Sequence, residues 1–159
     1  MPENKLFNLS NIILIIIVIS FGFLVFSIFM WNGSKEDMPN KVIIGDNTIF
    51  VELAQTREDH SKGLMNKTNL PEDNGMLFIF SKPRSVNLWM KNTLIPLDMI
   101  FIDEDNVIVN IETAQPCKED PCKEFSSKVG VKFVLEVNAG YADNHNIKQG
   151  DEIILLLDE

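Results

Sequence analysis

The pattern of apolar and polar residues divides the chain into an uncharged apolar run and a domain of short segments. Residues 12–31 (IILIIIVISFGFLVFSIFMW) contain no charged side chain over 20 positions. At about 1.5 Å rise per residue, a helix of this length extends roughly 30 Å, the thickness of a bilayer core. The run lacks the polar stripe of a helix that packs on a soluble core. Residues 12–31 therefore predict a transmembrane helix.

A cleaved signal peptide is the alternative to an uncleaved anchor. The apolar stretch of such a peptide is usually about 7–15 residues long, and small residues follow it at the cleavage site. Here the stretch is longer, and residues 29–32 (FMWN) offer no such site. Trp31 lies at the end of the run, where an indole prefers the membrane interface. We therefore expect an uncleaved anchor, followed by a short polar linker over residues 32–41.

Residues 42–159 consist of short β-type segments separated by turn residues. Ile49, Val51 and Leu53 alternate with other side chains, and Gly45-Asp46-Asn47 before them is typical of a hairpin. Thr56 predicts the start of a short helix, because its hydroxyl can cap a first turn that carries acidic residues. The expected strands are 42–44, 48–53, 76–80, 86–90, 99–102, 107–111, 132–137 and 153–157, and the expected helices are 56–63 and 139–146.

These segments predict a β-dominated α+β domain. The expected architecture is a barrel-like or curled antiparallel sheet with two short helices, preceded by the transmembrane helix. We expect Lys82-Pro83-Arg84 to end the strand over 76–80, and residues 116–127 to form a loop.

The charge of the domain argues against a nucleic-acid partner. The whole chain has 14 Lys and Arg and 23 Asp and Glu. Lys5 and Glu3 lie before residue 32, so residues 32–159 have 13 Lys and Arg and 22 Asp and Glu, a formal net charge of −9. Such a domain repels phosphate backbones and anionic lipids. We therefore expect no nucleic-acid partner, and the acidity is typical of a soluble surface.

The chain has two cysteines, Cys117 and Cys122. Their spacing is not the Cys-x-x-Cys of redox enzymes, and His60 and His145 are not at zinc-ligand spacing. A close pair behind an export-type segment indicates a disulfide in an oxidising compartment, with a redox or metal role as the alternative. Flanking charges do not decide the orientation. The cysteines therefore place residues 1–11 in the cytoplasm and the domain on the periplasmic side of the inner membrane.

The segment from Trp89 to Asp98 carries the largest group of polar residues between two apolar strands. Buried polar side chains need partners, and the structural interpretation is that Asn92 and Thr93 bond to the backbone while Asp98 pairs with Lys91 or Arg57. The functional interpretation is a pocket with an aromatic wall and convergent polar groups. The candidate ligand-binding residues are Arg57, Trp89, Lys91, Asn92, Thr93, Asp98 and Glu112.

Catalytic motifs are weak in this sequence. No serine lies in a Gly-x-Ser-x-Gly elbow, and there is no Walker A or dinucleotide-binding glycine motif. A carboxylate pair is conceivable among Asp98, Glu112 and Glu136, with salt bridges as the simpler interpretation. Methionines can bind Cu(I) outside the cytoplasm, but they are also common core residues. We therefore name no catalytic residue, and we expect no metal and no cofactor.

Several motifs in a fixed order resemble one family. The sequence is similar to the bacterial and archaeal family named domain of unknown function 192 over about residues 42–158. The similar segments are Gly63-Leu-Met65, residues 70–80 (LPEDNGMLFIF), residues 88–103 (LWMKNTLIPLDMIFID), Pro116-Cys117 with Asp120-Pro-Cys122, residues 134–137 (VLEV) with Gly140, and residues 147–151 (IKQGD). The resemblance implies a small β-rich fold, often behind a signal peptide or anchor, and a disulfide between Cys117 and Cys122. It implies no reaction.

The sequence thus predicts a membrane-anchored module of the cell envelope that binds a ligand or a protein and is not a catalyst. Its expected partners are the inner membrane, through residues 12–31, and an envelope ligand or protein of unknown identity. The alternatives are an envelope hydrolase that uses carboxylates such as Asp98 and Glu112, and a copper-handling protein.

Overall fold

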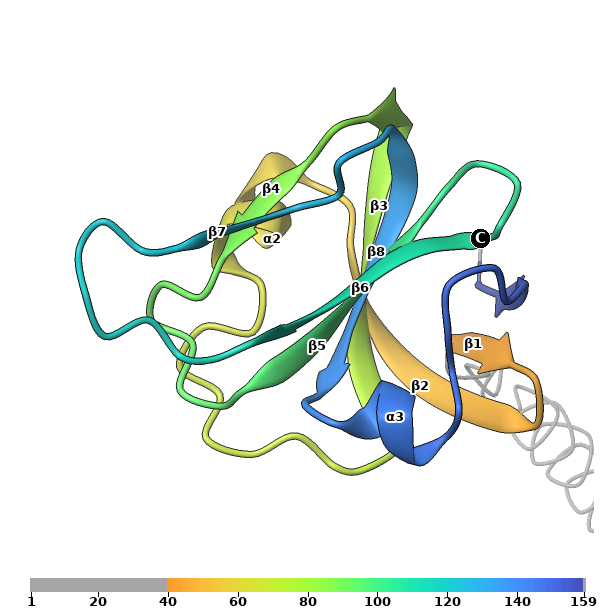
Figure 1. Cartoon of the computed structure of the whole chain (residues 1–159), viewed down its shortest axis with the longest axis horizontal. Helices are drawn as coiled ribbons and strands as arrows, with labels where there is room; N and C mark the ends of the chain where they lie inside the picture. The colour runs from red at the N-terminus through yellow and green to blue at the C-terminus, as the bar shows by residue number, and fades with distance from the viewer. Residues whose placement is uncertain (1–39, 159) are drawn as a thin grey trace, which may run out of the picture. The chain divides into compact units, whose positions relative to one another are not determined.

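The computed structural model describes residues 40–158, which form nine strands and two short helices (Figure 1). A seven-stranded sheet has the strand order β6-β5-β8-β3-β2-β1-β9, and β4 and β7 form a separate two-stranded sheet. The strands are β1 (Lys41–Ile44), β2 (Asn47–Ala54), β3 (Asn74–Arg84), β4 (Asn87–Trp89), β5 (Leu97–Ile102), β6 (Ile108–Ala114), β7 (Glu124–Ser126), β8 (Val131–Asn138) and β9 (Ile153–Leu156); the helices are α2 (Arg57–Lys62) and α3 (Tyr141–Asn144).

The seven-stranded sheet is curled into a half-barrel, as the sequence predicted for a β-dominated domain (Figure 1). Its two outer strands approach each other at one bridge between Val107 and Glu152. There the N–H of Ile108 donates to the carbonyl of Asp151 at 2.9 Å. The curl brings the chain segments before β6 and β9 together, although these strands lie at opposite ends of the strand order.

One pair of neighbouring strands differs from the predicted antiparallel sheet. β2 and β3 run parallel, with Phe50 opposite Asn74 and Leu53 opposite Leu77. Parallel neighbours need a crossover connection, and residues 55–73 with α2 provide it. All other pairs in the sheet are antiparallel.

Alternation along the strands gives the sheet two apolar faces, because successive side chains of a strand point to opposite sides. Met76, Phe78 and Met99 belong to one cluster, which β4, β7 and the segment after α2 cover. Leu77 and Ile100, their direct neighbours in sequence, belong to the other cluster, which α3 covers. The two faces therefore have different surroundings, and the face of a residue decides what its side chain meets.

Two local predictions were wrong. Lys82-Pro83-Arg84 does not end β3, which continues to Arg84 and pairs there with Val131 after a register shift. Proline is tolerated at such an irregular, exposed end of a strand. Residues 116–127 are not all loop, since β7 pairs with β4 and Trp89 lies opposite Glu124. A three-residue strand is too short to leave a clear alternation in the sequence.

The helix start at Thr56 is confirmed. Its hydroxyl accepts from the N–H of Asp59 at 3.1 Å, and the Asp59 carboxylate accepts from the N–H of Thr56 at 2.9 Å. Within residues 40–158 no helix is long and apolar enough to cross a membrane. The predicted anchor at residues 12–31, residues 1–11 and the linker up to residue 39 lie outside the described residues.

Candidate functional site

A row of side chains on one face of the sheet places a glutamate at its centre. Strand register aligns Glu136 of β8 with Met76 of β3 on one side and with Met99 of β5 on the other. The row continues from Met99 to Glu112 on β6 and from Met76 to Glu52 on β2. Cross-strand partners share a face of the sheet, so Glu136 points to the face that α2 and β4 cover. Its row neighbours Met76 and Met99 are apolar.

Glu136 is buried, with 5% of its surface exposed. Within residues 40–158 no group donates a hydrogen bond to its carboxyl. All fully enclosed side-chain oxygens in that range have a hydrogen-bond partner. The carboxyl is therefore not sealed in the core and keeps access to the cavity beside it. A Cβ on Gly63 would lie 3.9 Å from Glu136 Oε2, which places the carboxyl at the end of α2.

This carboxyl opens into a cavity of about 220 Å³. Its walls come from the end of α2 and the following turn, from β3, from β4 with Val86 before it, and from Thr93. They combine aromatic rings, two cations, neutral polar groups and a single carboxyl. The lining residues are His60, Ser61, Lys62, Gly63, Leu64, Met65, Phe78, Phe80, Arg84, Val86, Asn87, Leu88, Trp89, Thr93 and Glu136.

Burial raises the pKa of Glu136 from its ordinary value of 4.5 to about 8, because the apolar surroundings disfavour the charged form. The shift has no other cause, in agreement with the missing hydrogen-bond donors. At neutral pH the carboxyl is therefore mostly protonated, so it can donate a hydrogen bond into the cavity as well as accept one.

Gly63 leaves room for this arrangement. It ends α2 with φ +46° and ψ −137°, a conformation that side chains rarely adopt. A Cβ there would lie 3.2 Å from Phe78 Cζ and would reduce the space in front of Glu136. Gly75 acts on the backbone instead, because a Cβ on it would come within 2.5 Å of the Glu136 carbonyl oxygen. Gly63 therefore leaves space for the carboxyl, and Gly75 lets β3 approach β8 closely.

His60 forms the wall of the cavity on α2. Its Nε2 lies 3.0 Å from the carbonyl oxygen of Ala54. Since a carbonyl only accepts, Nε2 carries the hydrogen. The imidazole also packs on Phe80 and Phe78, with ring centroids 4.8 and 5.8 Å apart. His60 is thus held in one orientation by the end of β2 and by the aromatic residues of β3.

The structure separates the predicted cluster around Trp89. Trp89 and Thr93 line the Glu136 cavity. Lys91 and Asn92 do not, and they border a different hollow beside Cys117 and Cys122. Lys91 still contacts this region indirectly, because its ammonium lies 5.7 Å from the centroid of the Trp89 ring.

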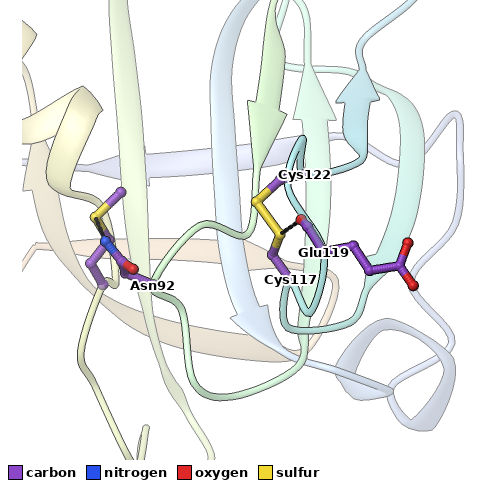
Figure 2. The surroundings of a disulfide bond; sticks show 5 residues. Asn92, Cys117, Glu119 and Cys122 are labelled. Carbon is purple, nitrogen blue, oxygen red and sulfur yellow. Dashed lines mark hydrogen bonds between the residues drawn. A yellow bond between two sulfur atoms is a disulfide. The ribbon is translucent and has the colours of Figure 1, made fainter.

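Asn92 and the cysteine pair are shown in Figure 2. Asn92 has φ +56°, which asparagine tolerates better than most residues, and its amide approaches Met65 Sδ at 4.0 Å. Cys117 and Cys122 form the predicted disulfide. The Cys117 sulfur lies 2.9 Å from the carbonyl oxygen of Glu119 (Figure 2). This loop therefore stands next to the Glu136 cavity without lining it.

Asp98 is a structural residue on the opposite face of the sheet. It is 1% exposed and accepts hydrogen bonds from Thr113 Oγ1 at 2.7 Å and from the N–H of Ala142 at 3.0 Å. The predicted salt bridge with Lys91 or Arg57 is wrong, because neither cation pairs with it. Asp98 instead ties β5 to β6 and to the start of α3.

Arg57 and Glu112 are also outside the cavity. Arg57 is exposed in the first turn of α2. Glu112 forms a salt bridge with Lys128 at 3.2 Å. Hydrogen bonds from Asn110 and Lys128 lower the pKa of Glu112, and the bond from Asn110 has the larger effect. Glu112 faces the side of the sheet opposite Asp98, because Met99 rather than Asp98 is its register partner. The suggested pair of Asp98 and Glu112 in one cleft is therefore wrong.

The sequence named Glu136 only as one member of a conceivable carboxylate pair and missed His60, Gly63 and Arg84 as cavity residues. One signal was present. Glu136 interrupts the apolar run Val134-Leu135-Glu136-Val137. Its side chain points to the same face of the sheet as Val134, two residues before it, and away from the face of Leu135. An acidic residue at a core position of a strand is the pattern that marks this site.

Comparisons with known proteins agree with the resemblance. A family model of domain of unknown function 192, described as "Uncharacterized ACR, COG1430", matches residues 40–155. A "UPF0127 protein" of Thermococcus sibiricus is 29% identical over 105 residues, which are 65% of this chain and 64% of that protein. The matched region thus spans less than two thirds of that relative.

Two crystal structures are similar in fold and sequence. One is a Sinorhizobium meliloti protein described as a proposed transcription regulator, with 36% identity and a TM-score of 0.66 over 73% of this chain and 91% of that one. The other is a protein of unknown function from Novosphingobium aromaticivorans, with 35% identity and a TM-score of 0.66 over 73% of this chain and 83% of that one. From the match over residues 40–155, this chain belongs to the domain of unknown function 192 family.

Proposed function

We propose that residues 42–159 form a ligand-binding module that holds a small molecule in the Glu136 cavity and does not transform it. The observation that carries this proposal is the carboxyl of Glu136, which has no hydrogen-bond partner within residues 40–158 and opens into a cavity with aromatic walls. Because the carboxyl reaches the cavity, a bound ligand can hydrogen-bond to it in place of water.

Binding is better supported than hydrolysis. A hydrolase of the carboxylate type needs two carboxyl groups on either side of the scissile bond. Glu136 is the single carboxyl of the cavity lining. Asp98 lies on the other face of the sheet, and Glu112 is held by Lys128 at the far end of the row. A protonated Glu136 has no second carboxyl here with which to divide acid and base roles.

Copper handling has less support. Cys117 and Cys122 are joined in a disulfide, so they offer no thiolate. Met76, Met90 and Met99 are buried core residues. Within residues 40–158, no group of three or more His, Cys, Asp or Glu side chains is arranged to hold a metal ion.

We further propose that the module is anchored in the inner membrane through residues 12–31 and lies on the periplasmic side. The uncharged apolar run and the disulfide support this location. The test is protease treatment of spheroplasts that express the full chain. Digestion of the domain without lysis is expected, and protection until lysis would contradict the orientation.

The binding proposal is tested by a fragment screen on the full chain in non-ionic detergent, read by NMR of ¹³C-methyl methionine. Met65 lines the cavity, and Met76 and Met99 flank Glu136. Ligands of the cavity are expected to shift these resonances and to stabilise the protein by about 2.7 kcal/mol at 100 times Kd.

Two variants locate the binding site. Glu136→Met removes the carboxyl from the cavity and should abolish the shifts. Glu112→Gln is the matched control, because it changes a glutamate of the same row that does not line the cavity. If fragments bind equally well to both variants, or if none shifts the Met65 resonance, the Glu136 cavity is not the binding site.

A further inference from the structure

The charges around the cavity differ in sign from those of the domain as a whole. The domain has a formal net charge of −9, yet the cavity lining contains Lys62, Arg84 and a single carboxyl, Glu136. Neither Lys62 nor Arg84 has an ion-pair partner in the part of the chain that the structure describes. Unpaired cations around a cavity attract an anion, and an exposed acidic surface elsewhere does not cancel that local field.

The cations and the glutamate occupy different parts of the lining. Lys62 and Arg84 are exposed, whereas Glu136 is buried. The guanidinium of Arg84 lies 4.8 Å from the centroid of the Phe80 ring, which holds it beside the cavity. Arginine supplies a planar set of N–H donors that matches a carboxylate or a phosphate. An anionic group can thus bind near the entrance while the rest of the ligand extends toward Glu136.

The walls of the cavity also carry aromatic rings. Phe78, Phe80 and Trp89 line the cavity, and Trp89 is 49% exposed. Flat apolar groups pack well on such rings. The cavity has a volume of about 220 Å³. The part of the ligand that lies inside it is therefore about the size of one ring or a short chain.

From this arrangement we infer that the ligand is a small organic anion, whose charged group binds Arg84 and Lys62 and whose apolar body lies between the aromatic walls and ends in a hydrogen bond with Glu136. This inference rests on the proposed function and adds the chemical class of the ligand. The ligand therefore needs a hydrogen-bond acceptor at its buried end.

The competing ligand is a small amine. An ammonium would pair with an ionised Glu136 and could stack on the aromatic rings. It would also have to pass Lys62 and Arg84 near the entrance, which repel it, and it would have to displace the proton of Glu136. The titratable and charged groups that line the cavity together with Glu136 are His60 and Lys62 from α2 and Arg84 from β3. Its neighbours in the row, Met76 and Met99, are uncharged.

Three probes of nearly equal size separate these cases: 4-methoxybenzoate, 4-methoxybenzamide and 4-methoxybenzylamine, called benzoate, benzamide and benzylamine below. Their shared ether oxygen is the acceptor that Glu136 requires at the buried end. They share the ring and differ in charge, being an anion, a neutral amide and a cation at neutral pH. Isothermal titration of the full chain in non-ionic detergent is expected to give binding for benzoate, at least tenfold weaker binding for benzamide, and none for benzylamine. Methionine NMR confirms that the site is the cavity.

Two arginines make a matched pair of variants. Arg84→Gln should weaken benzoate binding at least tenfold, because it removes the guanidinium from the cavity. Arg57→Gln should leave it unchanged, because Arg57 is an exposed arginine that does not line the cavity. Both changes remove one surface charge, so a general effect of net charge would alter the two variants equally. Equal losses would overturn the inference.

The pH dependence supplies an independent readout. Burial raises the pKa of Glu136 to about 8, so benzoate should bind about tenfold more weakly at pH 9 than at pH 7, as Glu136 loses the proton that it donates. Glu136→Gln should bind benzoate within a few fold of the wild type at pH 7 and show no such loss at pH 9, because an amide donates at both pH values.

The outcomes also separate this inference from the proposed function. If benzylamine binds in the cavity, more tightly as the pH rises, the ligand class is wrong and the cavity remains a binding site. If none of the three probes binds while unrelated fragments shift the Met65 resonance, the ligand class is again wrong. If no fragment of any class binds, both proposals fail.

Discussion

Replacing Glu136 with glutamine tests the burial of its carboxyl through the pH dependence of folding. The pKa is about 8 in the folded protein and 4.5 ordinarily. Between these values the folded state holds a proton that the unfolded state has released, so the free energy of unfolding falls as the pH rises. The stabilising contribution is complete below pH 4.5 and is lost by the time the pH passes 8. At about 1.4 kcal/mol per pH unit, the whole change is on the order of 5 kcal/mol.

Urea unfolding of the full chain in non-ionic detergent measures this effect, with Trp89 fluorescence in a Trp31→Phe background as the signal. At pH 5, 6, 7, 8 and 9 the free energy of unfolding of Glu136→Gln is subtracted from that of the wild type. The difference isolates Glu136, because the other titrating groups are common to both proteins. We expect the difference to fall by roughly 1.4 kcal/mol per unit from pH 5 to 8 and then to level off. A difference that does not change with pH would refute the buried, uncompensated carboxyl.

Three further variants test the structure around the site by urea unfolding. Gly63→Ala should destabilise by about 2 kcal/mol and weaken probe binding, because it forces a side chain into a positive-φ conformation 3.2 Å from Phe78; unchanged stability would contradict the backbone conformation at Gly63. Asp98→Ala should cost about 3 kcal/mol by leaving the Ala142 N–H and the Thr113 hydroxyl without their acceptor, while probe affinity stays the same; a loss of affinity in the folded variant would return Asp98 to the site. Cys117→Ser with Cys122→Ser should cost about 2 kcal/mol through the short loop of the disulfide, again with unchanged affinity, and loss of binding would link the disulfide loop to the cavity.

The sequence predicted the parts of the fold that depend on local chemistry. Thr56 and Asp59 cap α2 as their types and spacing indicate. The alternation of Ile49 and Val51 placed β2 correctly, and both residues are buried. The parallel pairing of β2 and β3 was missed, because nothing local in either strand records which neighbour it will have or in which direction.

The candidate site was predicted less well for the same reason. The polar residues from Trp89 to Asp98 are close in sequence, which suggested one pocket. The backbone turns between them, so that Thr93 lines the cavity, Lys91 and Asn92 border the disulfide loop and Asp98 faces the other side of the sheet. Glu136 and His60 meet only through the pairing of β3 with β8 and the crossover through α2. A register is needed to see such a site, and a single sequence does not contain it.

The energetics of Glu136 argue that the residue serves binding and not folding. At pH 7 the folded state keeps a proton that the unfolded chain gives up, and this costs about 3 kcal/mol relative to a side chain that does not titrate. Methionine has a similar length and matches the neighbours Met76 and Met99 in the row. We therefore expect Glu136→Met to be more stable than the wild type by about 2–3 kcal/mol at pH 7 while losing probe binding. A site that lowers stability in order to present a polar group is typical of functional positions. If Glu136→Met is instead destabilised, the carboxyl has structural partners in the folded protein, and its role in ligand binding loses its main physical support.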